Sequence, residues 1–215
     1  MVQEAGVTLS ELPIGAKLAA QASRLGHRPL ITLPDGMLTY AGAEALSARL
    51  AGALAALGYG MGDVIAVLCG NSIPLVTAWF ACARLGAVFM PVNTLLSGAL
   101  LRAVLAHSGA RIVLCGRARY AALRHVRTDL PALRHVVVAG RARFAGTLAF
   151  ETLLDKASAV PLPHMEIDPA CAAKLLYTSG TTGHPKGVVW SRACESTHAA
   201  AYAGELLPIA EGEGL

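Results

Sequence analysis

A stretch of chain without a single charged residue, residues 64–83, constrains the fold more than any other feature. It reads VIAVLCGNSIPLVTAWFACA. Its length suits a membrane-spanning helix, which needs about 20 apolar residues. The turn-forming residues GNSIP interrupt it, however, and Arg84 follows directly. We therefore expect a buried strand, a turn and a buried helix, with a membrane span as the alternative.

The segments around this stretch repeat the alternation of strand and helix. Continuous apolar runs typical of buried parallel strands recur, and segments with apolar residues at helical spacing follow them. Strands are expected at residues 64–68, 87–92, 111–115 and 135–139, and helices at residues 39–57, 72–85, 97–108, 120–127 and 147–157. A β-hairpin around Pro34, Asp35 and Gly36 is expected before them. This order predicts an α/β fold with a mostly parallel sheet flanked by helices.

The ends of three predicted helices carry start and stop signals. A hydroxyl residue that can cap the first turn precedes each helix, and a glycine that can end it follows. The pairs are Thr39 with Gly58, Ser72 with Gly86, and Ser97 with Gly109.

Composition narrows the class of protein. The chain is 54% hydrophobic and 15% charged, which permits a sizeable core and argues against global disorder. The net charge is +4, and basic residues gather loosely over residues 111–143 without interleaved aromatics, so a solvated face is favoured over a nucleic-acid surface.

Five cysteines, an odd number without CxxC or metal-ligand spacing, favour a reducing, cytoplasmic setting. No metal ligands are predicted, and the N-terminal residues do not resemble a signal peptide.

The second part of the chain begins after a proline-rich segment. We expect a first α/β subdomain at residues 1–160, a connection at residues 161–171, and the start of a second subdomain at residues 172–215. In the last part, two strands enclose a polar loop and a helix follows at residues 191–203. The final residues, LLPIAEGEGL, contain no closing element, so the chain is expected to stop within a larger architecture.

The loop between those two strands has the composition of a phosphate site. It lies in YTSGTTGHPKGVV, residues 177–189, which is neither a Walker A motif nor a GxGxxG fingerprint. Successive backbone N–H groups in a glycine-rich turn can form an anion-binding nest. The hydroxyl side chains add donors, and Lys186 can reach an outer phosphate as a point charge. An ordinary polar hairpin loop is the alternative on composition alone.

The residues LLYTSGTTGHPKGVV, 175–189, resemble the phosphate-binding signature of the adenylate-forming (AMP-binding) superfamily. That superfamily comprises acyl-CoA synthetases, peptide-synthetase adenylation domains and luciferases. Residues 38–72 are similar to its early helix–turn–strand segment, and residues 81–114 to its GAV–P–N segment. The resemblance covers residues 29–191 and is closest in kind to the acyl-CoA synthetases.

The resemblance implies a two-step reaction. A small-molecule carboxylic acid, fatty acids among them, reacts with ATP to give an acyl-adenylate and pyrophosphate, and coenzyme A then takes the acyl group; Mg²⁺ assists. It also implies which residues hold the β- and γ-phosphates, namely Thr178, Ser179, Gly180, Thr181, Thr182, Gly183 and Lys186. His184 is interpreted as a variable loop residue.

The chain departs from the family pattern in two ways. After PKGVV many members have a hydroxyl residue followed by His, whereas this chain has Ser191 followed by Arg192, with Trp190 before them. The later adenine, Mg²⁺, ribose and catalytic-lysine segments are not found, and Lys174 is not assigned that last role. We therefore expect the N-terminal portion of the family's large domain, incomplete and inactive alone. The alternatives are a catalytically dead remnant that binds a nucleotide or a partner, and a fragment of a peptide-synthetase adenylation domain.

Overall fold

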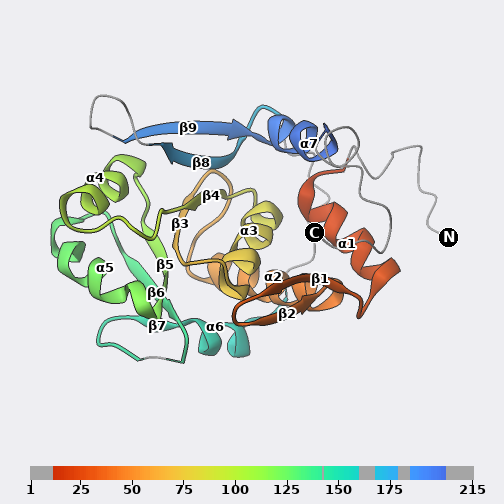
Figure 1. Cartoon of the computed structure of the whole chain (residues 1–215), viewed down its shortest axis with the longest axis horizontal. Coiled ribbons are helices and arrows are strands. Elements are labelled where there is room, and N and C mark those ends of the chain that lie inside the picture. Colours follow the sequence, from red (N-terminus) through yellow and green to blue (C-terminus); the bar gives the residue numbers. More distant parts are fainter. Residues whose placement is uncertain (1–11, 142, 160–167, 179–184, 202–215) are drawn as a thin grey trace.

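A single sheet organises the part of the chain that the computed structural model describes, namely residues 12–141, 143–159, 168–178 and 185–201 (Figure 1). Seven strands pair in the order β7-β6-β5-β3-β4-β8-β9. Their bounds are β3 Val64–Leu68, β4 Val88–Pro91, β5 Ile112–Gly116, β6 His135–Ala139, β7 Leu148–Ala149, β8 Ala172–Thr178 and β9 Lys186–Ser191. All neighbours run parallel except β8 and β9, which are antiparallel. The predicted α/β fold with a mostly parallel sheet is confirmed.

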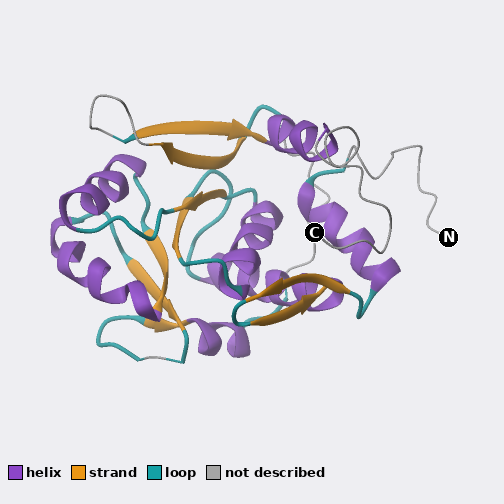
Figure 2. Cartoon of the chain, viewed as in Figure 1, coloured by secondary structure: helices purple, strands orange, loops and turns teal. Residues whose placement is uncertain are grey.

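Helices cover both faces of this sheet (Figure 2). One face carries α2 (Tyr40–Ala56), α3 (Ile73–Leu85) and α6 (Phe150–Lys156), and the other carries α4 (Gly98–Ser108) and α5 (Tyr120–Val126). Short 3₁₀ turns, η2 (Arg117–Arg119) and η3 (Arg127–Asp129), flank α5, while α7 (Arg192–Ala201) follows β9. Because both faces are covered, the central strands are apolar without alternation, as expected for buried parallel strands.

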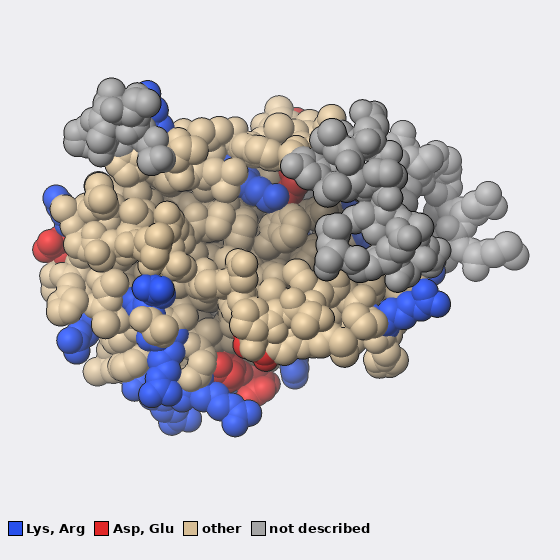
Figure 3. Space-filling model, viewed as in Figure 1, with Lys and Arg blue, Asp and Glu red and all other residues tan. Residues whose placement is uncertain are grey.

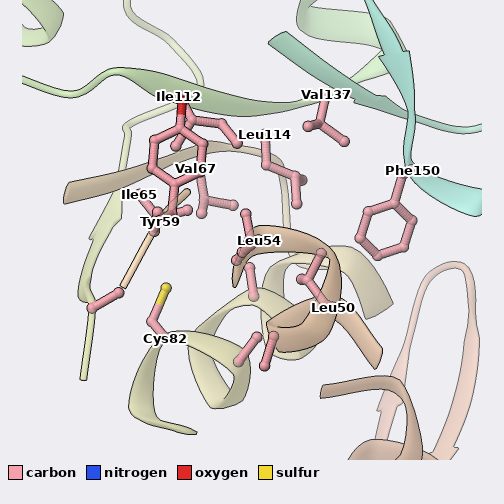
Figure 4. Close-up of a cluster of buried hydrophobic side chains, with 14 of the residues drawn as sticks. Leu50, Leu54, Tyr59, Ile65, Val67, Cys82, Ile112, Leu114, Val137 and Phe150 are labelled. Carbon is pink, nitrogen blue, oxygen red and sulfur yellow. The ribbon is translucent and has the colours of Figure 1, made fainter. Parts of the chain in front are cut away.

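Side chains on the two faces of the sheet pack into two separate hydrophobic cores. In β3, Ile65 and Val67 pack against α2, α3 and α6, and Ala66 and Leu68 pack against α4 and α5. Figure 4 shows the first core, in which Leu50 and the other labelled apolar side chains converge between helices and sheet. Successive side chains of a strand point to opposite faces, so one continuous apolar run supplies both layers.

The uncharged stretch that opened the sequence analysis becomes β3, a turn and α3, as predicted. Within the described residues, none of the helices has both the length and the apolar character needed to cross a bilayer. The membrane-span alternative for residues 64–83 is therefore wrong. Gly86, in the left-handed region at φ 74°, ends α3 as expected.

The N-terminal part of the fold contains one helix that the sequence analysis did not predict. This helix, α1 (Ile14–Leu25), packs with the predicted hairpin of β1 (Pro29–Leu33) and β2 (Gly36–Thr39) around Leu18, Leu38 and Phe80. Its apolar residues Ile14, Leu18 and Leu25 recur at helical spacing, so the sequence did carry a signal for this helix that the sequence analysis missed.

The capping predictions are partly confirmed. Thr39 caps α2, since its hydroxyl accepts a hydrogen bond from the Gly42 N–H at 3.0 Å. Ser72 stands at the start of α3, but its hydroxyl donates to the Gly70 carbonyl instead. The Asp35 carboxylate accepts from the Ile73 N–H at 3.0 Å, so the tip of the hairpin caps α3 from outside.

The helix predicted at residues 147–157 is shorter than expected. Its first residues form the edge strand β7, whose Leu148 and Ala149 pair with β6, and the helix α6 begins only at Phe150. The open edge of β6 explains the difference, because pairing satisfies backbone groups that a helical turn there would leave exposed.

The strands β8 and β9 extend the same sheet beyond β4. β8 joins β4 through one parallel pair, Phe89 with Lys174. The residues between α6 and β8 fall largely outside the described part, so the division into two subdomains stays a prediction.

Candidate functional site

The predicted phosphate loop lies in sequence between β8 and β9, at the end of the hairpin where the two strands are connected. Thr178 is the last residue of β8 and pairs directly with Lys186, the first residue of β9, and both are exposed. The other predicted residues of the site, Ser179, Gly180, Thr181, Thr182 and Gly183, lie outside the described residues, as does His184. The structure thus brings the two described members of the predicted site together at one end of the hairpin (Figure 1).

Close packing of neighbouring side chains accounts for the glycine at position 187 of the signature. A Cβ atom at this position would lie 3.2 Å from Leu175 Cδ1 and 3.4 Å from Tyr177 Cζ, closer than carbon atoms normally approach. The side chains of Leu175 and Tyr177 therefore lie against the β9 backbone at Gly187, and a larger residue there would require the Leu175 side chain to shift. The glycine that follows Lys186 serves packing within the hairpin.

The Tyr177 hydroxyl also joins the hairpin to the helical layer. It shares a hydrogen bond with His107 Nδ1 on α4 at 2.6 Å, and the two rings meet edge to face. Burial raises the pKa of Tyr177, so the phenol is neutral at physiological pH. This contact stabilises the hairpin close to the end that carries Thr178.

A polar cavity of about 530 Å³ lies beside this end of β8. The residues that follow β3 and β4 line it together with the end of β8, namely Cys69, Gly70, Asn71, Leu75, Pro91, Val92, Asn93, Thr94, Leu176 and Tyr177. Ligands of parallel α/β sheets bind outside the carboxyl ends of the strands, and this cavity is at that edge. Its size lies within the range of small-molecule sites.

A second hollow of about 320 Å³ adjoins the polar cavity and shares Asn71, Leu75 and Pro91 with it. Its remaining wall is apolar and comes from β1, α3 and β4, namely Ile31, Leu33, Val76, Trp79 and Phe89. A polar space and an apolar space thus meet at the edge of the sheet.

The sequence analysis did not assign Asn71, Asn93 or Thr94. Each lies two or three residues after the end of a buried strand, in CGN and PVNT, and polar residues at the carboxyl ends of adjacent parallel strands are a recognisable signal. The pairing of β3 with β4, which brings the two segments together, is known only from the structure.

Cys69 forms part of the cavity wall, and its thiol is a poor nucleophile there. Burial raises the pKa of its thiol to about 12, so the thiolate that would react is scarce at neutral pH. All five cysteines are free, in agreement with the absence of paired spacing.

Lys174, which the sequence analysis did not assign to the catalytic role, lies within β8. Its ammonium group is 2.9 Å from Glu195 Oε1 on α7 and 4.4 Å from the centre of the Trp79 ring on α3. The Trp79 indole N–H donates to the same carboxylate oxygen at 2.9 Å. These three side chains join β8, α7 and α3, which gives Lys174 a structural role.

Arg192, where the chain departs from the family pattern, is the first residue of α7 and is buried. Within the described part of the chain, its Nε and Nη2 atoms have no hydrogen-bond partner, and burial lowers its pKa. It lies beyond the end of β9 opposite to Lys186. The departure therefore lies away from the predicted phosphate site.

Metal ligands are not gathered in the described residues, where no three His, Cys, Asp or Glu side chains come close enough together to hold an ion. The expectation of no metal ligand among the site residues stays a prediction.

These features define an α/β domain with a ligand cavity at the carboxyl edge of its sheet and a glycine- and hydroxyl-rich loop beside it. The particular family follows from comparison with known proteins. The chain belongs to the AMP-binding enzyme family, whose model matches residues 18–208.

Several curated relatives are CoA ligases. The chain is 33% identical over 169 residues to the long-chain-fatty-acid–CoA ligase FadD13 of Mycobacterium tuberculosis, covering 78% of this chain and 32% of that protein. It is 35% identical over 162 residues to the indoleacetate–CoA ligase of Aromatoleum aromaticum, covering 75% and 31%. The chain thus spans about a third of the length of these relatives.

Solved structures agree with this placement. The inhibitor-bound N-terminal domain of FACL13 from Mycobacterium tuberculosis superposes with a TM-score of 0.76 at 32% identity, covering 90% of this chain and 47% of that one. A benzoate CoA ligase from Burkholderia xenovorans gives a TM-score of 0.79 at 26% identity, covering 93% and 38%. The chain therefore corresponds to the N-terminal part of acyl- and aryl-CoA ligases.

Proposed function

We propose that this chain is the N-terminal portion of an ATP-dependent acyl-CoA synthetase. In the complete reaction a carboxylate attacks the α-phosphorus of ATP and displaces pyrophosphate, and the thiol of coenzyme A then displaces AMP from the acyl-adenylate. The observation that carries the proposal is the loop signature on a hairpin beside the carboxyl edge of the sheet, in a chain of the AMP-binding family.

The residues that we assign to the β- and γ-phosphates are Thr178, Ser179, Gly180, Thr181, Thr182, Gly183 and Lys186. Pyrophosphate gains negative charge as it leaves, and N–H, hydroxyl and ammonium donors held in place stabilise that charge. The described pair supports this role, because Thr178 and Lys186 lie opposite each other and are open to solvent.

The polar cavity supplies space for the rest of the nucleotide next to this loop. Asn71, Asn93 and Thr94 can offer amide and hydroxyl groups there, and Tyr177 closes the wall on the side of β8. These side chains would orient the ligand and would take no part in proton transfer. We assign no catalytic residue and no Mg²⁺ ligand within this chain, so the chain alone is expected to form no acyl-adenylate.

Another relative favours a second candidate for the thiol substrate. The chain is 35% identical over 154 residues to an L-proline–[L-prolyl-carrier protein] ligase of Pseudomonas fluorescens. The first step would then be the same, and a carrier-protein thiol would replace coenzyme A. The phosphate role of the loop is common to both candidates, as it is to a remnant that binds nucleotide without catalysis.

Equilibrium dialysis of ATP against the chain tests the proposal. A charge-assisted hydrogen bond in an exposed loop contributes about 1.5 kcal/mol, so affinity is expected to be millimolar, about −4 kcal/mol. Lys186→Ala should weaken binding about tenfold. His184→Ala is the matched control in the same loop and should leave affinity unchanged. Equal binding by the Lys186→Ala variant would contradict the assignment.

A further inference from the structure

One short sequence occurs twice and its copies lie side by side in the fold. GRARY occupies residues 116–120 and GRARF residues 140–144. The first leaves β5 and the second leaves β6, and these strands pair in parallel with Gly116 opposite Ala139. Neighbouring strands are ~4.8 Å apart, so both turns emerge next to each other from the same edge of the sheet.

The two turns are packed against each other on their inner side. The rings of Tyr120 and Phe144 stack with their centres 4.0 Å apart and their planes 19° from parallel. A Cβ atom on Gly140 would lie 3.2 Å from Arg117 Cβ, and Gly140 has a φ of +107°. Only glycine fits this close approach and this backbone angle. The turns therefore form one unit.

The second turn holds a strained backbone. Arg141 has a φ of 51°, the one residue other than glycine with a positive φ in the described part of the chain. The Glu151 carboxylate accepts hydrogen bonds from the N–H groups of Gly140 at 2.8 Å and Arg141 at 3.2 Å. Burial raises the pKa of Glu151, but these bonds outweigh it and hold that pKa below its usual value. Left-handed geometry at a residue with a side chain persists where surroundings enforce it, often at functional positions.

The two packed turns together present a cluster of positively charged side chains on the surface. The side chains of Arg117, Arg119, Arg141 and Arg143 are all exposed; we call them the arginine face. Arg127 lies beside them and donates to the Gly146 carbonyl at 2.9 Å. Figure 3 shows basic side chains gathered at the lower left, over α5 and the connection between β6 and β7. The Glu151 carboxylate, which lies against these turns, accepts hydrogen bonds from the backbone N–H groups of Gly140 and Arg141.

We propose that the arginine face docks this protein on membrane surfaces rich in anionic phospholipids. Guanidinium groups bind phosphate oxygens in paired hydrogen bonds, and clustered arginines are attracted to an anionic leaflet. Nucleic acid fits less well, because Tyr120 and Phe144 stack on each other and are not free to stack on bases. A pocket-bound phosphate also fits less well, since the two cavities described above are lined from β1, α3, β3, β4 and β8 and not from these turns.

Co-sedimentation with unilamellar vesicles at low salt tests this inference. Vesicles contain either phosphatidylcholine alone or phosphatidylcholine with about 30% phosphatidylglycerol, which supplies the anionic surface. The chain should bind the anionic vesicles and not the neutral ones. Each arginine near such a surface contributes about fivefold, so Arg119→Gln with Arg143→Gln should weaken binding about 25-fold. These two positions leave the strained Arg141 and the contact of Arg117 with Gly140 intact.

The matched control is Arg49→Gln with Arg102→Gln, which removes the same charge from exposed positions on α2 and α4. Its binding should fall no more than about twofold, because those charges lie elsewhere on the surface. The inference is overturned by an equal loss in both double variants, by equal binding to neutral vesicles, or by no binding to the anionic vesicles. Release of the bound chain by inorganic phosphate at a matched concentration of phosphate groups would also overturn it, because a site for soluble phosphate would then explain the arginines.

Discussion

The Lys174–Glu195 ion pair should couple the phosphate-loop hairpin to the body of the domain. The two side chains are 19% and 7% exposed, and Glu195 Oε1 also accepts from the Trp79 indole. Glu195→Gln would leave the Lys174 ammonium largely buried without its counter-charge. Breaking a buried pair costs about 3–5 kcal/mol. The Trp79 ring, 4.4 Å from the ammonium, retains about 1 kcal/mol of favourable interaction, so we expect a loss of about 2–4 kcal/mol.

Urea unfolding of a double-mutant cycle measures this coupling. Lys174→Met and Glu195→Gln should each destabilise the fold, and the double variant should be more stable than their sum predicts by about 1.5 kcal/mol or more, since neither charge is then left alone. Lys156→Met, at an exposed position on α6, is the control and should change stability by less than about 0.5 kcal/mol. Additive losses, with a coupling below about 0.5 kcal/mol, would refute the reasoning.

Three further outcomes are expected. Gly187→Ala should cost about 1–3 kcal/mol in urea unfolding, because its Cβ would press on Leu175 and the Tyr177 ring. At pH 8 a thiol reagent should modify the exposed Cys194 well before the buried Cys69. Because burial raises the pKa of the Cys69 thiol from 9.0 to about 12, the protonated thiol contributes its full stability below pH 9, and this contribution is lost as the pH rises toward 12. Carboxylate-dependent ATP–pyrophosphate exchange should be undetectable for the chain alone, and its detection would contradict our assignment of no catalytic residue.

The fold could be predicted because its main signals are local. Apolar runs such as residues 64–68 and glycines such as Gly86 act within a few residues of themselves. Where the prediction failed, a distant group decided the outcome. Asp35 caps α3 in place of Ser72, and the edge of β6 draws residues 148–149 into a strand.

The residues of the candidate site could likewise be predicted where they are contiguous in sequence and could not where they come from distant segments. The phosphate loop is contiguous in sequence, so its residues could be named from the signature around Lys186. The wall of the cavity and the ion pair at Lys174 are assembled from remote segments; Trp79 and Glu195, for example, are separated by 116 positions. Such contacts depend on the order of strands in the sheet, which the sequence of one chain does not specify.

The most direct test of the central claim locates the phosphate on the chain itself. Pyrophosphate is titrated into ¹⁵N-labelled protein, and the amide signals of Gly180 and Gly183 are followed by NMR. The account predicts that these two signals move with one millimolar dissociation constant, while amides of α1 and α5 stay in place. If Gly180 and Gly183 do not respond while signals elsewhere move, the loop between Thr178 and Lys186 is not the phosphate site of this protein.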